Sequence, residues 1–387
     1  MTSVVGVSPD DDNMTPEWYC VAPFRQVYID NKGISPCCQY TRVNTDLSTW
    51  FSGAELQSIQ TQMLSNQQPE PCKSCVRDEA AFGQSLRTQS NQDYNNKVVT
   101  DTKMNFVDYR ASNVCNFKCR SCTPTFSNGI ANETIRSPTL QKFFQIEPEK
   151  VARVSESNFE YIIENLQDID RLMFTGGEPT KMPEVKGMLE KVVERDGHRI
   201  GILITTNGSF TDSFWYDLVD KIPNLHWTLS LDAVGSAAGI IRHGTHWPTV
   251  EKNARWLAKN AASLMINTVV TNLSLFQLNP LLQFVTELQQ SSNRRNGCNH
   301  RFHVSSRPYR LAADNLDPEK LQQAIVYLEY CLQNSTVESQ KSMLTSLIKQ
   351  LNTAKFDQRL WENCQEYNQC LDELRAENHQ ELFVPCY

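Results

Sequence analysis

The sequence predicts an α/β fold built as a partial (βα)6 TIM-like barrel, with a small cysteine-rich hairpin and helix domain before it and a helical extension after it. Short β-branched apolar runs recur along the middle of the chain, each followed by about 10–15 residues of helical pattern, which indicates parallel βαβ units. About six such units form an open barrel. Cysteines gather at the end of the first predicted strand, where such folds carry their chemistry.

Composition limits the class of protein. The 387 residues are 40% hydrophobic and 21% charged, which is enough apolar material for a sizeable core. The net charge of −7 argues against a nucleic acid partner held by bulk electrostatics. Apolar runs fall far short of the roughly 18 residues that span a bilayer, and the N-terminus has no signal-peptide pattern. We therefore expect a soluble, cytoplasmic protein with no membrane partner.

The chain is expected to divide into four regions. Residues 1–83 contain the first cysteines, and the Gln-, Asn- and Ser-rich residues 84–103 are predicted to form a surface linker. The barrel is expected over 104–310 and a helical region over 311–387, in which Asp317 begins the first helix as its N-cap.

Each barrel element follows from the same two patterns. The strands are expected within residues 106–110, 171–179, 201–208, 226–232, 264–271 and 301–304. The helices of the barrel and of the C-terminal region are expected at 182–195, 212–221, 249–260, 278–290, 317–332, 337–351 and 357–377. Cys364 and Cys370 fall in the last helix and are interpreted as packing residues, and Cys298 as a surface thiol.

The 13 cysteines indicate metal ligands rather than disulfides, because a reducing cytosol disfavours a disulfide framework. Cys115, Cys119 and Cys122 follow the first predicted strand with C-x3-C-x2-C spacing. Three thiolates on one short loop hold three corners of a cubane iron–sulfur cluster and leave the fourth iron open to a substrate or cofactor. A structural zinc site needs a fourth ligand, and no further Cys or His follows nearby.

Further motifs occur in order after this loop. A Gly-Gly-Glu-Pro turn at 176–179 ends the second predicted strand, and Thr-Asn-Gly at 206–208 ends the third. Ser-Leu-Asp at 230–232 ends the fourth, and Arg242 follows it. Together with the cysteine triplet these motifs resemble the radical S-adenosylmethionine (radical SAM) enzymes, and the resemblance spans roughly residues 104–305.

The resemblance implies a [4Fe–4S] cluster held by the triplet, with S-adenosylmethionine chelated at the open iron. In this family an electron from the reduced cluster breaks a C–S bond, and the 5′-deoxyadenosyl radical that results abstracts hydrogen from a substrate. An external reductant such as flavodoxin or ferredoxin supplies the electron. Many members have an aromatic residue before the third cysteine, where this chain has Ser121. The implied cofactor-binding residues are Gly176, Gly177, Glu178, Pro179, Asn207, Ser230, Asp232 and Arg242.

A second cysteine group precedes the barrel and flanks a predicted hairpin at 27–35. It resembles the SPASM/twitch auxiliary-cluster domains of radical SAM enzymes, although those usually follow the barrel. The resemblance implies that Cys20, Cys37, Cys72 and Cys75 bind an auxiliary [4Fe–4S] cluster, with Cys37 preferred over its neighbour Cys38 because the family's ligand follows a proline. The same four thiolates also suit a zinc hairpin.

We therefore expect a radical SAM enzyme whose auxiliary cluster accepts an electron during oxidation or cross-linking of a peptide or protein. One alternative is an oxidoreductase of a small sugar or aminocyclitol, with a polar pocket lined by Arg110, Arg307 and Tyr309. A second alternative is a zinc or iron–sulfur scaffold without enzymatic activity. The sequence names no catalytic base or hydrogen donor.

Overall fold

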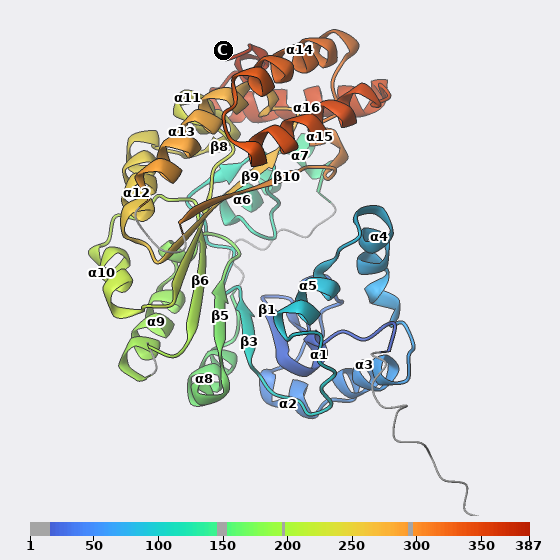
Figure 1. Ribbon diagram of the computed structural model, residues 1–387, viewed down its shortest axis with the longest axis vertical. Coiled ribbons are helices and arrows are strands. Elements are labelled where there is room, and N and C mark those ends of the chain that lie inside the picture. Colours follow the sequence, from blue (N-terminus) through green and yellow to red (C-terminus); the bar gives the residue numbers. More distant parts are fainter. Residues whose placement is uncertain (1–15, 145–152, 196–197, 293–296) are drawn as a thin grey trace, which may run out of the picture. The chain divides into compact units, whose positions relative to one another are not determined.

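The structure is a computed structural model that describes residues 16–144, 153–195, 198–292 and 297–387 (Figure 1). The chain divides into two compact units. The first comprises residues 1–109 and 154–171, and the second comprises 110–153 and 172–387. Each unit is described by itself below.

The second unit contains a row of strands in the order β5, β6, β7, β9, β10. The pairs β6–β7, β7–β9 and β9–β10 are parallel. The strands are β5 (Arg171–Phe174), β6 (Gly201–Thr206), β7 (Leu225–Ser230), β9 (Ser263–Val270) and β10 (Cys298–Val304). The predicted α/β class with a parallel sheet is therefore confirmed.

Helices follow these strands. Four lie where they were predicted, namely α9 (Pro183–Arg195), α10 (Ser213–Lys221), α12 (Trp247–Asn260) and α13 (Leu278–Ser291), whereas α11 (Gly235–Ile241) was not predicted (Figure 1). Along β6 every second residue is buried, including Ile202 and Ile204, while the residues between them are half-buried. The same period-2 pattern in β5, β7 and β9 gives each of these strands one fully buried face and one half-buried face.

A two-stranded sheet that the sequence did not predict pairs β4 (Lys118–Cys119) with β8 (Arg242–His243). Its antiparallel register places Cys119 opposite Arg242. Strands of two residues have no periodicity, so hydrophobic patterning does not detect them. The sheet joins the cysteine loop, residues 115–122, to the chain that follows α11. After the loop come α6 (Asn128–Arg136) and α7 (Pro138–Gln141).

The first unit contains the predicted hairpin, β1 (Gln26–Asp30) and β2 (Gly33–Ser35), paired antiparallel. β3 (Phe106–Tyr109) pairs with β1 in parallel, so the strand expected to begin the barrel shares a sheet with this hairpin. The helices are α1 (Ala22–Arg25), α2 (Leu47–Ser52), α3 (Ala54–Leu64), α4 (Lys73–Phe82), α5 (Leu86–Asp93) and α8 (Glu156–Glu164).

Helix α5 lies inside the segment whose composition suggested a linker. The Ser85 hydroxyl accepts a hydrogen bond from the Thr88 amide, and the Thr88 hydroxyl accepts one from the Ser85 amide, which forms a capping box. Such reciprocal caps satisfy two unpaired backbone donors and stabilise even a polar helix. The local capping therefore outweighs the polar composition.

The C-terminal region forms α14 (Pro318–Asn334), α15 (Glu338–Asn352) and α16 (Gln358–Arg375), and Asp317 caps α14 through the Lys320 amide as predicted. A 3-10 turn, η6 (His379–Phe383), follows. Cys364 is buried, as expected. Cys298 is buried as well, so its prediction as a surface thiol was wrong; it begins β10, whose pairing covers it.

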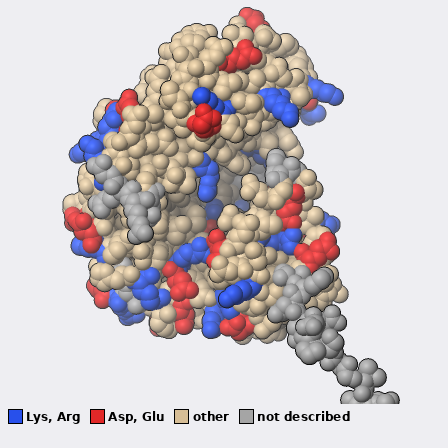
Figure 2. All heavy atoms as spheres, viewed as in Figure 1, with Lys and Arg blue, Asp and Glu red and all other residues tan. Residues whose placement is uncertain are grey.

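On the face shown in Figure 2, acidic and basic side chains of the described residues are interspersed, and neither sign forms a separate patch. Among the described residues, no helix has the length and apolar character needed to cross a membrane.

Candidate active site

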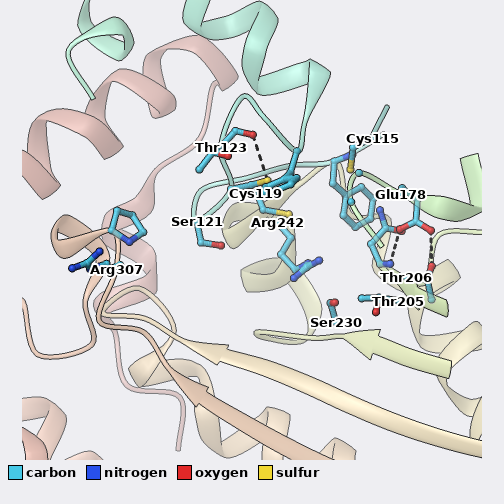
Figure 3. Close-up of a pocket in the computed structure, with 17 residues that line it drawn as sticks. Cys115, Cys119, Ser121, Thr123, Glu178, Thr205, Thr206, Ser230, Arg242 and Arg307 are labelled. Carbon is cyan, nitrogen blue, oxygen red and sulfur yellow. Dashed lines mark hydrogen bonds between the residues drawn. The ribbon is translucent and has the colours of Figure 1, made fainter. Parts of the chain in front are cut away.

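One cavity of about 610 Å³ in the second unit collects most of the motif residues (Figure 3). It lies at the carboxyl ends of the strands, because Thr205 and Thr206 end β6 and Ser230 ends β7. The predicted site residues in its lining are Cys115, Cys119, Cys122, Gly176, Gly177, Glu178, Asn207, Ser230 and Arg242. Pro179 and Asp232 are buried beside them but do not line the cavity.

The cysteine loop presents three thiols to this cavity. The amide of Cys115 donates to Asn128 Oδ1 (3.0 Å), and the amide of Cys122 donates to the Cys119 carbonyl (3.0 Å). Burial raises the pKa of all three thiols, to about 12 for Cys122, and Cys119 raises the pKa values of Cys115 and Cys122 further. Three such thiolates cannot ionise together without a compensating cation, and iron supplies that charge when it is coordinated. The donor set fits an iron–sulfur cluster.

The Gly-Gly turn packs against the chain just before Cys115. A Cβ on Gly177 would lie 2.2 Å from the Val114 carbonyl oxygen, and Gly176 has a φ of 104°. The amide of Glu178 donates to the same Val114 carbonyl (2.8 Å). Glycine is required at 177 because backbone approaches backbone there. The motif therefore fixes the start of the cysteine loop relative to β5.

Glu178 is 1% exposed and ties the turn to the end of β6. Its carboxylate accepts hydrogen bonds from Thr180 Oγ1 (2.6 Å), Thr206 Oγ1 (2.7 Å) and the Asn207 amide (2.7 Å). Burial raises the pKa of Glu178, and these hydrogen bonds act against the rise. Glu178 lines the cavity with its carboxylate held by these three hydrogen bonds.

Arg242 is the cation of the cavity wall nearest the thiols, and Figure 3 shows it between the cysteine loop and Ser230. It donates to Asp232 Oδ2 (2.9 Å), and Asp232 Oδ1 accepts from the Val269 amide (2.8 Å). Burial lowers the pKa of Arg242, but Cys119 and Asp232 raise it above its ordinary value. Nε of Arg242 is buried without a hydrogen-bond partner among the described residues. Asp232 thus holds the Arg242 side chain, which lines the cavity.

The remaining lining identifies residues that sequence reasoning missed or left open. Phe117 and Phe126 contribute apolar surface near Ser121. Arg307 lies at the side of the cavity away from Glu178 (Figure 3). Of the other two expected pocket residues, Arg110 instead stacks on Phe126, with 5.4 Å from its guanidinium to the ring centre, and Tyr309 lies outside the lining. Phe126 had no motif to mark it.

The second cysteine group also converges, within the first unit. Cys20, Cys37, Cys72 and Cys75 line one small apolar cavity, whose described lining does not include Cys38. Burial raises the pKa of Cys37 to about 12 and of Cys72 to about 11. Arg87, which forms an ion pair with Glu79, lies in the same wall.

Among the described residues, no three or more His, Cys, Asp or Glu side chains lie close enough together to hold a metal ion.

Comparison with known proteins identifies the class of the second unit's core. Residues 109–276 match the family model described as the Radical SAM superfamily. These residues therefore form a radical SAM domain, and the predicted resemblance is confirmed over them. No curated protein sequence matches the chain.

Several solved structures are similar to the chain. Native anSMEcpe with bound AdoMet is 17% identical with a TM-score of 0.40, covering 57% of this chain and 58% of that chain. Streptococcus suis SuiB bound to precursor peptide SuiA is 17% identical with a TM-score of 0.40, covering 74% and 59%. TYW1 with a lysine-pyruvate adduct is 15% identical with a TM-score of 0.32, covering 61% and 72%. The match spans less than two thirds of the first two chains.

Proposed function

We propose that the protein is a radical SAM enzyme in which Cys115, Cys119 and Cys122 hold a [4Fe–4S] cluster beside an S-adenosylmethionine site. One observation carries this proposal. Thiols, a Gly-Gly turn and polar side chains from separate strand ends line a single cavity in a radical SAM domain. When bound, the cluster and cofactor supply a 5′-deoxyadenosyl radical that takes hydrogen from a substrate.

The chain's own residues would bind and orient the cofactor. The guanidinium of Arg242 suits the methionine carboxylate, with Asp232 holding it in place. Glu178 and the carbonyls of the Gly-Gly turn suit the ammonium group, and Asn207 and Ser230, which line the same cavity, suit the ribose hydroxyls. Phe117 and Phe126 offer adenine the apolar contact that Ser121 cannot give.

The four thiols of the first unit are proposed to hold an auxiliary [4Fe–4S] cluster. A cluster with four cysteine ligands has no open iron, so its chemistry is electron transfer. It would accept the electron left after hydrogen abstraction and deprotonation, which favours net oxidation or cross-linking. Its resemblance to SPASM/twitch units supports a peptide or protein substrate, with flavodoxin or ferredoxin as the reductant.

A second substrate class has one observation in its favour. Arg307 lines the cavity, and a cation in a cavity wall suits a small polar or anionic substrate. An oxidoreductase of a small sugar is therefore the second candidate.

The decisive experiment is anaerobic reconstitution with iron and sulfide, followed by dithionite and S-adenosylmethionine. We expect 5′-deoxyadenosine from the wild-type chain and none from the C115A/C119A/C122A variant. The matched control is C370A, which removes a thiol outside both groups and should leave cleavage intact. A wild-type chain that is loaded with iron but releases no 5′-deoxyadenosine, or a chain that binds only zinc, would contradict the proposal.

A further inference from the structure

Arg120 lies between Cys119 and Cys122, and its side chain is 0% exposed. Its Nε donates to the Ile240 carbonyl (3.0 Å). Its Nη1 donates to the carbonyl (3.2 Å) and Oδ1 (3.0 Å) of Asn368. Its Nη2 donates to Asp372 Oδ1 (2.5 Å) and Glu377 Oε2 (2.7 Å). These bonds use all five N–H donors of a guanidinium, and most of them reach α16 or the residues just after it.

The backbone of Arg120 is held by the same region. Its carbonyl accepts from the Tyr367 hydroxyl on α16 (2.8 Å). Its amide donates to the Ile241 carbonyl (2.9 Å). Hydrogen bonds therefore hold both the main chain and the side chain of Arg120 in the cysteine loop. Every one of these partners lies far from Arg120 in the sequence.

The two carboxylates that accept hydrogen bonds from Arg120 are held in place by further contacts. Asp372 Oδ2 accepts from the amide (2.9 Å) and lies 2.6 Å from Nδ1 of His379. Glu377 Oε1 lies 2.5 Å from Nδ1 of His243 on β8. Ala376 ends α16 with a φ of 53°, a left-handed conformation that is uncommon for alanine. This turn brings Glu377 back beside Asp372, so both carboxylates meet one guanidinium.

A second set of ion pairs holds Lys118, the residue on the other side of Cys119. Lys118 Nζ lies 2.5 Å from Glu133 Oε1. Arg375, whose side chain is buried, donates from Nη2 to Glu133 Oε2 (2.7 Å). Both chain neighbours of Cys119, Lys118 and Arg120, are thus held by ion-pair networks that include residues of α16 or the turn after it.

We propose that the C-terminal segment 358–379, outside the matched radical SAM domain, is a latch that sets the spacing of the three cluster thiols, with Arg120 as its positioning residue. The inference rests on the proposed function, because the loop it positions is the one proposed to bind the cluster. A buried arginine needs paired carboxylates, since its charge is otherwise left without compensation. Placing that arginine between two metal ligands ties the order of the loop to the presence of α16. A binding loop held in place before the ligand arrives loses less conformational entropy on binding.

The test compares two buried tyrosines of the C-terminal helices. Y367F removes the hydroxyl that donates to Arg120. Y327F, the matched control, removes a hydroxyl that bonds the Asn279 amide and the Cys386 carbonyl and does not touch the loop. D372N, R120Q and R120K complete the series in the full chain, reconstituted anaerobically.

Two readouts follow the cluster. One is the rate at which a chelator removes iron, and the other is the change in the electron paramagnetic resonance spectrum of the reduced protein when S-adenosylmethionine is added. Removing a residue that holds a metal ligand in place lowers the affinity or activity of a metal site about tenfold or more. We expect iron loss about tenfold faster in D372N and R120Q, with a smaller effect in Y367F. R120K, which keeps the charge but not the planar fork, should lie between R120Q and wild type. Y327F should match wild type.

A third readout needs no cluster. Hydrogen exchange at residues 115–122 of the metal-free chain should be faster in D372N and Y367F, and unchanged in Y327F. If D372N and Y367F both showed the wild-type rates of hydrogen exchange and of iron loss, the latch proposal would be overturned, even if R120Q failed to fold. If adding S-adenosylmethionine did not change the spectrum of the reduced wild-type protein, the proposed function would be refuted instead. The hydrogen-exchange rates alone would then test the latch.

Discussion

Cys119 and Arg242 are cross-strand partners in the sheet of β4 and β8, so a proposed cluster thiolate and a buried guanidinium lie opposite each other. Asp232 pairs with the same guanidinium at 2.9 Å from outside the cavity lining. This relay connects the end of β7 to the cysteine loop. We therefore expect Asp232 to act through Arg242, where the motif alone suggested cofactor contact.

The variant D232N tests that indirect role. It keeps the shape of the side chain but leaves the buried Arg242 without its carboxylate. Removing one partner of a buried pair costs about 3–5 kcal/mol, so we expect a clear fall in the free energy of unfolding. The affinity for S-adenosylmethionine should fall about tenfold, equivalent to roughly 1.4 kcal/mol. Equilibrium binding to the reconstituted protein and chemical denaturation measure the two effects. Unchanged affinity with lowered stability would mean that Asp232 serves the fold only.

How far the sequence predicted this site depends on how local each contact is. The strand ends and their motifs were predictable, because a strand and the turn after it are encoded by consecutive residues. Gly177 was predicted as a site residue from its motif, but the close approach that requires glycine there is to the Val114 carbonyl, more than sixty positions earlier in the chain. The contacts of Arg120 with Asp372 and Glu377 were not predictable, since no local pattern links residues so far apart in sequence.

The variant G177A tests the close approach at the Gly-Gly turn. Its Cβ would overlap the Val114 carbonyl, and forcing extra atoms into a packed site costs about 1–3 kcal/mol. We expect lower stability and incomplete loading of the triplet with iron. G187A is the control, because Gly187 lies in α9 with nothing within 4 Å of its added Cβ. Replacing a helical glycine with alanine should stabilise by about 0.5–1 kcal/mol. Equal effects of the two variants would contradict the packing argument.

His300 on β10 predicts a dependence of stability on pH. Thr268 Oγ1 donates to the Leu231 carbonyl and accepts from His300 Nε2 (2.9 Å), and Nδ1 is buried without a partner among the described residues. Burial lowers the pKa of His300 from 6.5 to about 3. Between these values the unfolded chain binds more protons than the folded chain, so stability falls as pH decreases below about 6.5.

The variant H300Q removes that titration and keeps a hydrogen-bond donor. Between pH 7.5 and pH 5.5 we expect the wild-type chain to lose about 1.4 kcal/mol more of its free energy of unfolding than the variant. Denaturant titrations at the two pH values give the difference directly. A wild-type chain no more sensitive to acid than H300Q would show that His300 is protonated in the fold.

Adjacent cysteines in the first unit give the sharpest test of the auxiliary site. Cys37 lines the cavity with Cys20, Cys72 and Cys75, and the described lining excludes Cys38. A cluster that loses one of four thiolate ligands is exposed to solvent and to loss of iron. We therefore expect C37A to retain about four of roughly eight irons per chain after reconstitution and desalting, while C38A retains them all. Because the two variants differ by one position, general effects of removing a thiol are matched. If C38A lost the iron and C37A kept it, the ligand assignment would be reversed; if the wild-type chain bound zinc in place of these irons, the first unit would be a zinc hairpin and could not accept an electron.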